Sequence, residues 1–156
     1  MCSFGTDEYI EQAVKTYSDS MLRAAYSVLK STEDAEDAVQ EAFLKLILKK
    51  PKLKSSEQEK AWLLRVTINI SKNMLRSAAR NTLPVTEEIS CSDENSELLA
   101  VVMSLPERYR TVIHLYYFEG YSINEIAAVL KLPPPTVGTR LARARKLLEG
   151  EISDGL

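Results

Sequence analysis

The stretch SINEIAAVLKLPPPTVGTRLARARKLL (Ser122–Leu148) predicts two helices joined by a tight turn. Its first serine and Glu125 have the spacing of a capping box, and they open a short helix that runs to Leu130. After a proline-rich turn, a last helix begins at Pro135 or Thr136 and continues to about residue 149. A short helix, a turn and a basic second helix form the helix-turn-helix pattern, whose second helix enters the major groove of DNA.

The last of these helices is predicted to have one apolar and one basic face. At 100° per residue, its apolar side chains fall on a narrow arc: Val137, Leu141, Ala144 and Leu148. The opposite arc collects hydroxyl groups and bases, namely Thr136, Thr139, Arg143 and Lys146, with Arg140 at its edge. Such groups can contact phosphates and base edges in a major groove. A solvated basic face that binds nothing is the alternative, and the ordered capping signals favour DNA contact.

This pair of helices belongs to a predicted C-terminal domain of residues 97–150. Leu98 to Leu105 form a short apolar helix, and Ser104 and Glu107 have the spacing of a second capping box. The helix that follows is expected to end near Phe118, before the glycine at position 120.

Residues 81–96, NTLPVTEEISCSDENS, are predicted to be a flexible linker because they are polar, acidic and without an amphipathic period. They separate the C-terminal domain from an N-terminal domain of residues 1–80. Three amphipathic helices are expected there: one over 7–30, one that Thr32 caps and Pro51 closes, and one that Ser56 and Glu59 cap. No alternating run predicts a strand, so the expected fold is all-α with two small helical domains.

The third N-terminal helix is also predicted to have a basic face. Bases and amides share an arc of about 100° on it: Arg65, Asn69, Lys72, Asn73, Arg76 and Arg80. From Lys60 to Arg80 there are five bases and no acid, so this face is suited to follow a phosphate backbone. Trp62, at the start of the same arc, is either a core residue or a stacking platform for an unpaired base.

The second helix has an acidic outer face instead, formed by Asp34, Asp37, Gln40 and Glu41. Such a face often serves solubility alone. Beside a basic DNA-binding helix, it also fits a second partner, a basic protein surface.

Composition excludes several classes of function. The chain has 156 residues, a net charge of −2 and two cysteines without a CxxC spacing, which suits a reducing cytosol. The longest apolar run is six residues, and no signal peptide is visible, so we expect no membrane insertion. There is no zinc-ligand spacing, catalytic triad or glycine-rich phosphate loop, and His114 stands alone in an apolar helix. We therefore expect neither an enzyme nor a cofactor.

Three segments in order resemble bacterial sigma factors of the sigma-70 family, in the small extracytoplasmic-function (ECF) group. DAEDAVQEAFLKL (Asp34–Leu46) is similar to their core-polymerase-binding segment, and AWLLRVTINISKNMLRSAAR (Ala61–Arg80) to their promoter-melting, −10-reading helix. LPERYRTVIHLYYFEGYSINEIAAVLKLPPPTVGTRLARARKLL (Leu105–Leu148) is similar to their −35-reading domain.

The resemblance implies a cytoplasmic transcription initiation factor that binds RNA polymerase core and directs it to promoters. Asp34, Asp37, Gln40 and Glu41 would dock on a coiled coil of the largest subunit, and the C-terminal domain on the flap. Asn69 and its neighbours would read the −10 element with Trp62 at the duplex fork, while Arg140 and Arg143 would lie in the −35 recognition helix. A separate anti-sigma protein that covers both domains is the family expectation.

Two other functions fit the residues less well. A stand-alone helix-turn-helix regulator has no need for the acidic segment 34–41, and a helical adaptor or anti-sigma-like protein has no need for two basic stripes. The chain departs from many relatives at Asn73, where they have Asp, and over PTVGT (135–139), where they have GTVKS. These departures affect the promoter preference expected of the chain.

Overall fold

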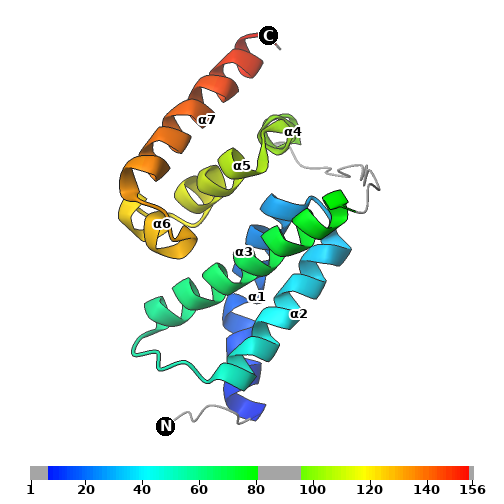
Figure 1. Ribbon diagram of the computed structural model, residues 1–156, viewed down its shortest axis with the longest axis vertical. Helices are drawn as coiled ribbons and strands as arrows, with labels where there is room; N and C mark the ends of the chain where they lie inside the picture. Colours follow the sequence, from blue (N-terminus) through cyan, green and yellow to red (C-terminus); the bar gives the residue numbers. More distant parts are fainter. Residues whose placement is uncertain (1–6, 81–95, 155–156) are drawn as a thin grey trace. The chain divides into compact units, whose positions relative to one another are not determined.

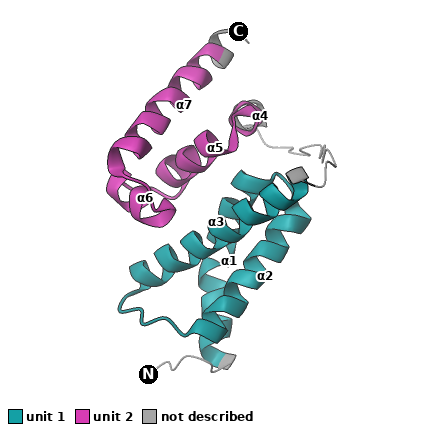
Figure 2. Cartoon of the chain, in the orientation of Figure 1, with its two compact units in different colours: residues 1–84 teal, residues 85–156 magenta. Residues whose placement is uncertain are grey.

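The computed structural model describes residues 7–80 and 96–154, where every regular element is helical (Figure 1). The predicted all-α fold is therefore confirmed. The chain divides into two compact units, unit 1 of residues 1–84 and unit 2 of residues 85–156 (Figure 2). Of the expected linker, residues 81–96, positions 81–95 lie outside the described residues, and Ser96 is already the first residue of the next helix.

Unit 1 is a bundle of three helices, α1 (Asp7–Leu29), α2 (Thr32–Lys49) and α3 (Ser56–Arg80), each of which packs against the other two (Figure 1). Its core combines small and large side chains. Ala24, Ala25, Ala35, Ala38 and Ala42 are fully buried beside Met21, Val28, Leu46, Leu63 and Leu64. The alanines let α1 and α2 approach closely, and the leucines of α3 fill the space that remains.

In two helices of unit 1 the capping residue lies one position before the expected one. The Ser31 hydroxyl accepts a hydrogen bond from the Asp34 amide at 3.2 Å, so Ser31 and not Thr32 caps α2. Ser55 likewise accepts from the Gln58 amide at 3.2 Å, and the Gln58 side chain accepts from the Lys54 amide at 2.9 Å. The capping box expected at position 56 is therefore wrong by one residue, since each cap has two adjacent hydroxyl residues to choose from.

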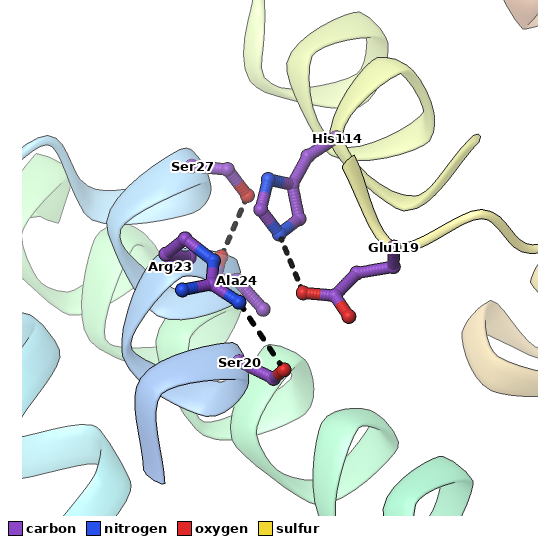
Figure 3. A network of polar contacts seen from close by, with 6 residues as sticks. All are labelled: Ser20, Arg23, Ala24, Ser27, His114 and Glu119. Carbon is purple, nitrogen blue, oxygen red and sulfur yellow. Dashed lines mark hydrogen bonds and ion pairs between the residues drawn. The ribbon is translucent and has the colours of Figure 1, made fainter. Parts of the chain in front are cut away.

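Buried hydroxyl groups in unit 1 are bonded within their own helices. Thr67 donates to the Leu63 carbonyl at 2.7 Å, and Ser71 donates to the Thr67 carbonyl at 2.8 Å. On α1, the Ser27 hydroxyl donates to the Ala24 carbonyl at 2.6 Å (Figure 3). These bonds let polar residues occupy the core at little cost, which widens the buried face of α3 beyond its apolar residues.

Unit 2 contains α4 (Ser96–Ser104), α5 (Glu107–Ile113), a π-helical turn η1 (His114–Phe118), α6 (Ile123–Leu130) and α7 (Pro134–Asp154). The long helix α7 packs against α4, α5 and α6. Fully or almost fully buried side chains join these helices: Val112, Ile113, Leu115, Ile126, Val129, Val137, Leu141 and Ala144.

The helix ends in unit 2 agree only partly with the sequence. The capping box of α6 is confirmed, whereas the box expected at Ser104 and Glu107 is wrong. Pro106 occupies the N-cap of α5 without a side-chain bond, and the Ser104 hydroxyl donates to the Val101 carbonyl at 2.6 Å instead. Gly120, with φ of +72°, lies just past η1 as expected, because this left-handed conformation favours glycine.

Candidate nucleic-acid interface

Helix α7 presents a basic face in the orientation that the sequence predicts. Val137, Leu141 and Ala144 are buried against unit 2, which fixes the rotation of the helix about its axis. Thr139, Arg143 and Lys146 are exposed, and Thr136 and Arg140 are half-buried. The Thr139 hydroxyl donates to the Pro135 carbonyl at 3.0 Å, so this side chain is held against its own helix. The exposed arc is therefore a defined surface with guanidinium groups near the start of the helix.

Four of these residues line a pocket that the sequence did not reveal. This pocket, here called the α5–α7 pocket, has a volume of about 390 Å³ and is formed by Arg108, Tyr109, Pro135, Thr136, Thr139, Arg140 and Arg143. Among the described residues that line it, three are arginines and none carries a carboxylate. Lys146, the remaining candidate on this helix, lies outside the lining.

Tyr109 connects the two walls of the α5–α7 pocket. Its side chain is 7% exposed, and the Cζ of Arg108 lies 4.6 Å from its ring centroid, within the range of a cation–π contact. Hydrogen bonding and the positive charge of Arg108, with a smaller effect of Arg143, lower the pKa of the Tyr109 hydroxyl. The phenol oxygen thus faces guanidinium groups from both helices. The sequence did not predict Arg108 as a site residue, and it indicated for Tyr109 only a core or domain-surface aromatic.

In unit 1, the basic face of α3 is accessible. Asn69, Asn73 and Arg76 are exposed, and Arg65 and Lys72 are half-buried, opposite the buried Leu64 and Ile68. Trp62 is half-buried at the N-terminal end of this face, so both interpretations of it stay open. The side chain of Arg80 lies outside the described part of the chain.

A polar groove of about 420 Å³ runs between α2 and α3 and brings together residues from two different predicted sites. Asp34 and Glu41, from the acidic face of α2, line it together with Asn73 from the basic face of α3. Lys45 lies in the same lining. Asn73 therefore has carboxylates near it, whereas Asn69, one turn earlier on α3, is outside the lining of this groove. These carboxylates disfavour a phosphate at Asn73.

The outer face of α2 is acidic at its start and apolar at its end. Asp37, Gln40 and Glu41 are exposed, and Leu44 and Leu48 follow on the same side of the helix with 56% and 79% of their surfaces exposed. We call these five residues the α2 ridge. Its two leucines were missed in the sequence, although their spacing of seven and eleven residues from Asp37 places them on this face.

An apolar groove of about 530 Å³ lies beside the α2 ridge, between α1 and α2. Gln40 and Leu44 belong to both the ridge and the groove, and Val14 and Ile47 widen its apolar floor. Exposed leucines next to a groove are typical of a protein-binding surface. The acidic residues at one end add charge complementarity for a basic partner.

Unit 2 also carries exposed aromatic side chains. Tyr117 and Phe118 in η1 are 55% and 62% exposed. The Nε of Arg145 donates a hydrogen bond to the Tyr117 hydroxyl at 2.8 Å, which fixes this ring against α7. Their exposure is unusual for aromatic residues, so this surface is a second candidate for protein contact.

His114 has a local partner: its Nε2 lies 3.5 Å from Oε1 of Glu119 in the same unit (Figure 3). Among residues 7–80 and 96–154, no cluster of three metal-ligating side chains is found. None of the helices in these same residues has the length and apolar character needed to cross a membrane.

Both units of the chain are similar to known proteins. Residues 13–81 match the family model for sigma-70 region 2, and residues 95–148 match the model for sigma-70, region 4. The ECF RNA polymerase sigma-E factor of Haemophilus influenzae is 32% identical, over 78% of this chain and 76% of its own. The ECF RNA polymerase sigma factor SigW of Bacillus subtilis is 26% identical, over 96% of this chain and 92% of its own.

Solved structures show the same fold. CnrH, in a complex with the cytosolic domain of CnrY, superposes with a TM-score of 0.72 at 26% identity, covering 96% of this chain and 91% of CnrH. The sigma factor RpoE of Bartonella quintana, in a complex with the anti-sigma factor NepR, superposes with a TM-score of 0.76 at 20% identity, covering 94% of this chain and 98% of RpoE.

Proposed function

Since this chain belongs to the ECF group of bacterial RNA polymerase sigma factors, we propose that its two units divide promoter recognition between α3 and α7. As a sigma factor it is a transcription initiation factor and not an enzyme: it binds RNA polymerase core and directs it to promoters. What remains to be assigned is the surface that performs each step.

Helix α7 reads the −35 element. The observation that carries this assignment is the fixed rotation of α7, whose buried Val137 and Leu141 hold Thr139 and Arg143 toward solvent. In a helix-turn-helix, the residues near the start of the second helix contact base edges, and an arginine can bond a guanine bidentately. Thr136 and Arg140 complete this surface, and Lys146, two turns beyond Thr139, reaches the backbone.

Helix α3 reads and opens the −10 element. Opening a duplex requires bases to leave the stack, and exposed amides and aromatic rings can bind such unpaired bases. Asn69 supplies the amide at the centre of the basic face, with Trp62 at its start and Arg65, Lys72 and Arg76 beside the phosphates. Asn73 faces the groove with Asp34 and Glu41, which suits it to a neutral base rather than a phosphate.

The α2 ridge docks on the core polymerase, at a coiled coil of its largest subunit. Asp37 and Glu41 supply charge for a basic partner, and Leu44 and Leu48 supply apolar area. Burying the two leucines removes exposed apolar surface from water, which stabilises the complex more than the exposed charges do. Tyr117 and Phe118 of unit 2 form a separate contact with the flap.

An anti-sigma protein regulates the chain by covering these same surfaces. The solved relatives are each bound to a second protein, CnrH to the cytosolic domain of CnrY and RpoE to the anti-sigma factor NepR, and this supports the same arrangement here. The apolar groove between α1 and α2 offers such a partner an apolar binding surface next to the ridge. We infer a cytoplasmic location because the polymerase acts there.

The docking assignment is tested by charge reversal on α2. Asp37→Lys with Glu41→Lys would place like charges against a basic surface, and such clashes cost several kcal/mol. The matched control is Glu11→Lys with Asp19→Lys, which reverses two exposed acids of α1. Pull-down with core polymerase should fail for the α2 variant and succeed for the control, with helicity unchanged in both. Equal retention of both variants would remove α2 from the interface.

A further inference from the structure

Arg145 lies on a different face of α7 from the arginines assigned to DNA. Arg143 and Arg145 are two residues apart, so they point about 200° away from each other around the helix. Arg143 belongs to the exposed arc that is proposed to read the −35 element. Arg145 is exposed as well, but it meets the turn η1 and has no part in the proposed function so far.

Arg145 contacts two neighbouring tyrosine rings of η1. Its Nε donates a hydrogen bond to the Tyr117 hydroxyl at 2.8 Å. Its Cζ lies 5.3 Å from the ring centroid of Tyr116 and 5.8 Å from that of Tyr117, within the range of cation–π contacts. The two tyrosine rings meet edge to face, with centroids 5.0 Å apart and planes at 73°. One guanidinium group therefore holds both the hydroxyl and the ring of Tyr117.

Phe118, the other exposed aromatic residue of η1, also has a neighbour that holds its ring. The ring stacks on His114, with centroids 5.6 Å apart and an angle of 18° between the planes. His114 in turn lies beside Glu119, which follows Phe118 in the chain (Figure 3). The exposed aromatic surface of η1 therefore has a defined shape before any protein binds to it.

The bond between Arg145 and Tyr117 has more effect on orientation than on stability. Both side chains are exposed, and water competes for a bond at such a site, so its removal changes the stability of a unit only slightly. The bond does limit the directions that the ring can take. A partner then does not have to order this side chain when it binds, and such ordering is a substantial cost of association.

We propose that Arg145 is a positioning residue for the contact between unit 2 and the flap of the polymerase, and that it acts by holding the Tyr117 ring in the orientation that the flap binds. This role rests on the proposed function, which assigns Tyr117 and Phe118 to the flap. It gives α7 two tasks, since Arg143 faces DNA while Arg145 orders a surface that binds protein.

The positioning role is tested by a double-mutant cycle on core polymerase binding without DNA. The fluorescently labelled full chain is titrated with core, as wild type, Arg145→Ala, Tyr117→Phe and the double variant. Each single substitution should weaken binding about 2- to 12-fold, the range expected for ordering one side chain. The double variant should bind no more weakly than either single variant, because both substitutions remove the same bond. The control is Lys131→Ala, which removes an exposed positive charge at the C-cap of α6 and should bind as wild type.

The hydrogen bond itself is followed by NMR of the full chain with ¹³C at the Cζ atoms of tyrosine. The signal of Tyr117 is identified as the one that Tyr117→Phe removes. Arg145→Ala should shift this signal, and the temperature of unfolding should stay that of wild type. Weaker core binding together with a lower unfolding temperature in Arg145→Ala would show a structural role and overturn the positioning assignment.

A core polymerase from which the flap is deleted separates the two proposals. Wild type and all variants should bind this core alike, and losses that persist on it would overturn the role of Arg145 at the flap. Losses that add up in the double variant would mean that Arg145 and Tyr117 contact the partner independently, which also contradicts positioning.

The flap contact on which this role rests has its own test on the complete core. If Tyr117→Ala with Phe118→Ala binds as wild type, the assignment of these rings to the flap fails. If this pair weakens binding while Arg145→Ala and Tyr117→Phe bind as wild type, the flap contact stands and the positioning role of Arg145 is wrong.

Discussion

Ser122 and Glu125 exchange two hydrogen bonds at the start of α6: the Ser122 hydroxyl accepts from the Glu125 amide at 3.1 Å, and the Glu125 carboxylate accepts from the Ser122 amide at 2.9 Å. This capping box fixes where the first helix of the helix-turn-helix begins. The position of α7 depends on it, because Ile126 and Leu130 of α6 pack in the core that holds Val137.

Removing this cap should destabilise unit 2. Ser122→Ala should lower the local stability of α6 by about 1 kcal/mol, as read from hydrogen exchange of its amides. Ser104→Ala is the control, since its exposed hydroxyl donates only to the Val101 carbonyl of its own helix, and it should change stability by less than about 0.5 kcal/mol. Equal effects of the two substitutions would contradict the capping role.

Glycine at position 138 should weaken α7. An added Cβ there meets no atom within 4 Å, so Gly138→Ala should stabilise the helix by up to about 1 kcal/mol, measured by hydrogen exchange in α7. Gly120→Ala should have the opposite sign because φ is +72° at that position. If Gly138→Ala stabilises the helix yet weakens DNA binding, the groove approaches α7 at this residue.

Promoter opening should depend on α3. Asn69→Ala and Trp62→Ala should reduce the permanganate reactivity of melted thymines on a promoter that the wild-type holoenzyme opens. Binding of the holoenzyme to the unopened duplex should change less. Gln12→Ala, on the exposed surface of α1, serves as the control. Loss of helicity in Trp62→Ala, seen by circular dichroism, would assign the half-buried indole to the core instead.

Alkaline pH should act on unit 1 through Tyr17. Its hydroxyl donates to the Ser56 carbonyl at 3.3 Å, and burial, followed by the negative charge of Glu59, raises its pKa above 10.0. The folded state therefore holds this proton more tightly than the unfolded state. The resulting stability is complete below about pH 10 and is lost as the pH rises through the folded pKa. In urea unfolding, the free energy of unfolding of Tyr17→Phe should fall less between neutral and alkaline pH than that of wild type. An equal fall in both proteins would contradict this role of Tyr17.

Sequence patterns predicted the helices better than their ends or their surfaces. The period of apolar residues placed Val137, Leu141 and Ala144 in the core, because burial follows helical geometry directly. The helix caps lie at Ser31 and Ser55, one residue before the expected positions, because neighbouring hydroxyl residues offer equivalent hydrogen bonds. The π-helical turn at 114–118 has no periodic signal of its own.

Contacts across helices were invisible to the pattern for a different reason. Arg108 and Tyr109 line one pocket with Arg143 through the packing of α5 on α7, which depends on tertiary structure. Asn73 and Asp34 likewise line one groove through the packing of α2 and α3. The exposed Leu44 and Leu48 had a usable signal, since they continue the face of Asp37, but leucine on a helix is usually read as core.

Transcription by a reconstituted holoenzyme tests the central claim most directly. The full chain is added to bacterial RNA polymerase core with fragmented genomic DNA as template, and RNA 5′ ends are mapped with and without the chain. Initiation should occur at a defined set of start sites that share upstream and −10 elements, and it should be lost with the double charge reversal at Asp37 and Glu41. Mapped starts that are the same with and without the wild-type chain would contradict the account.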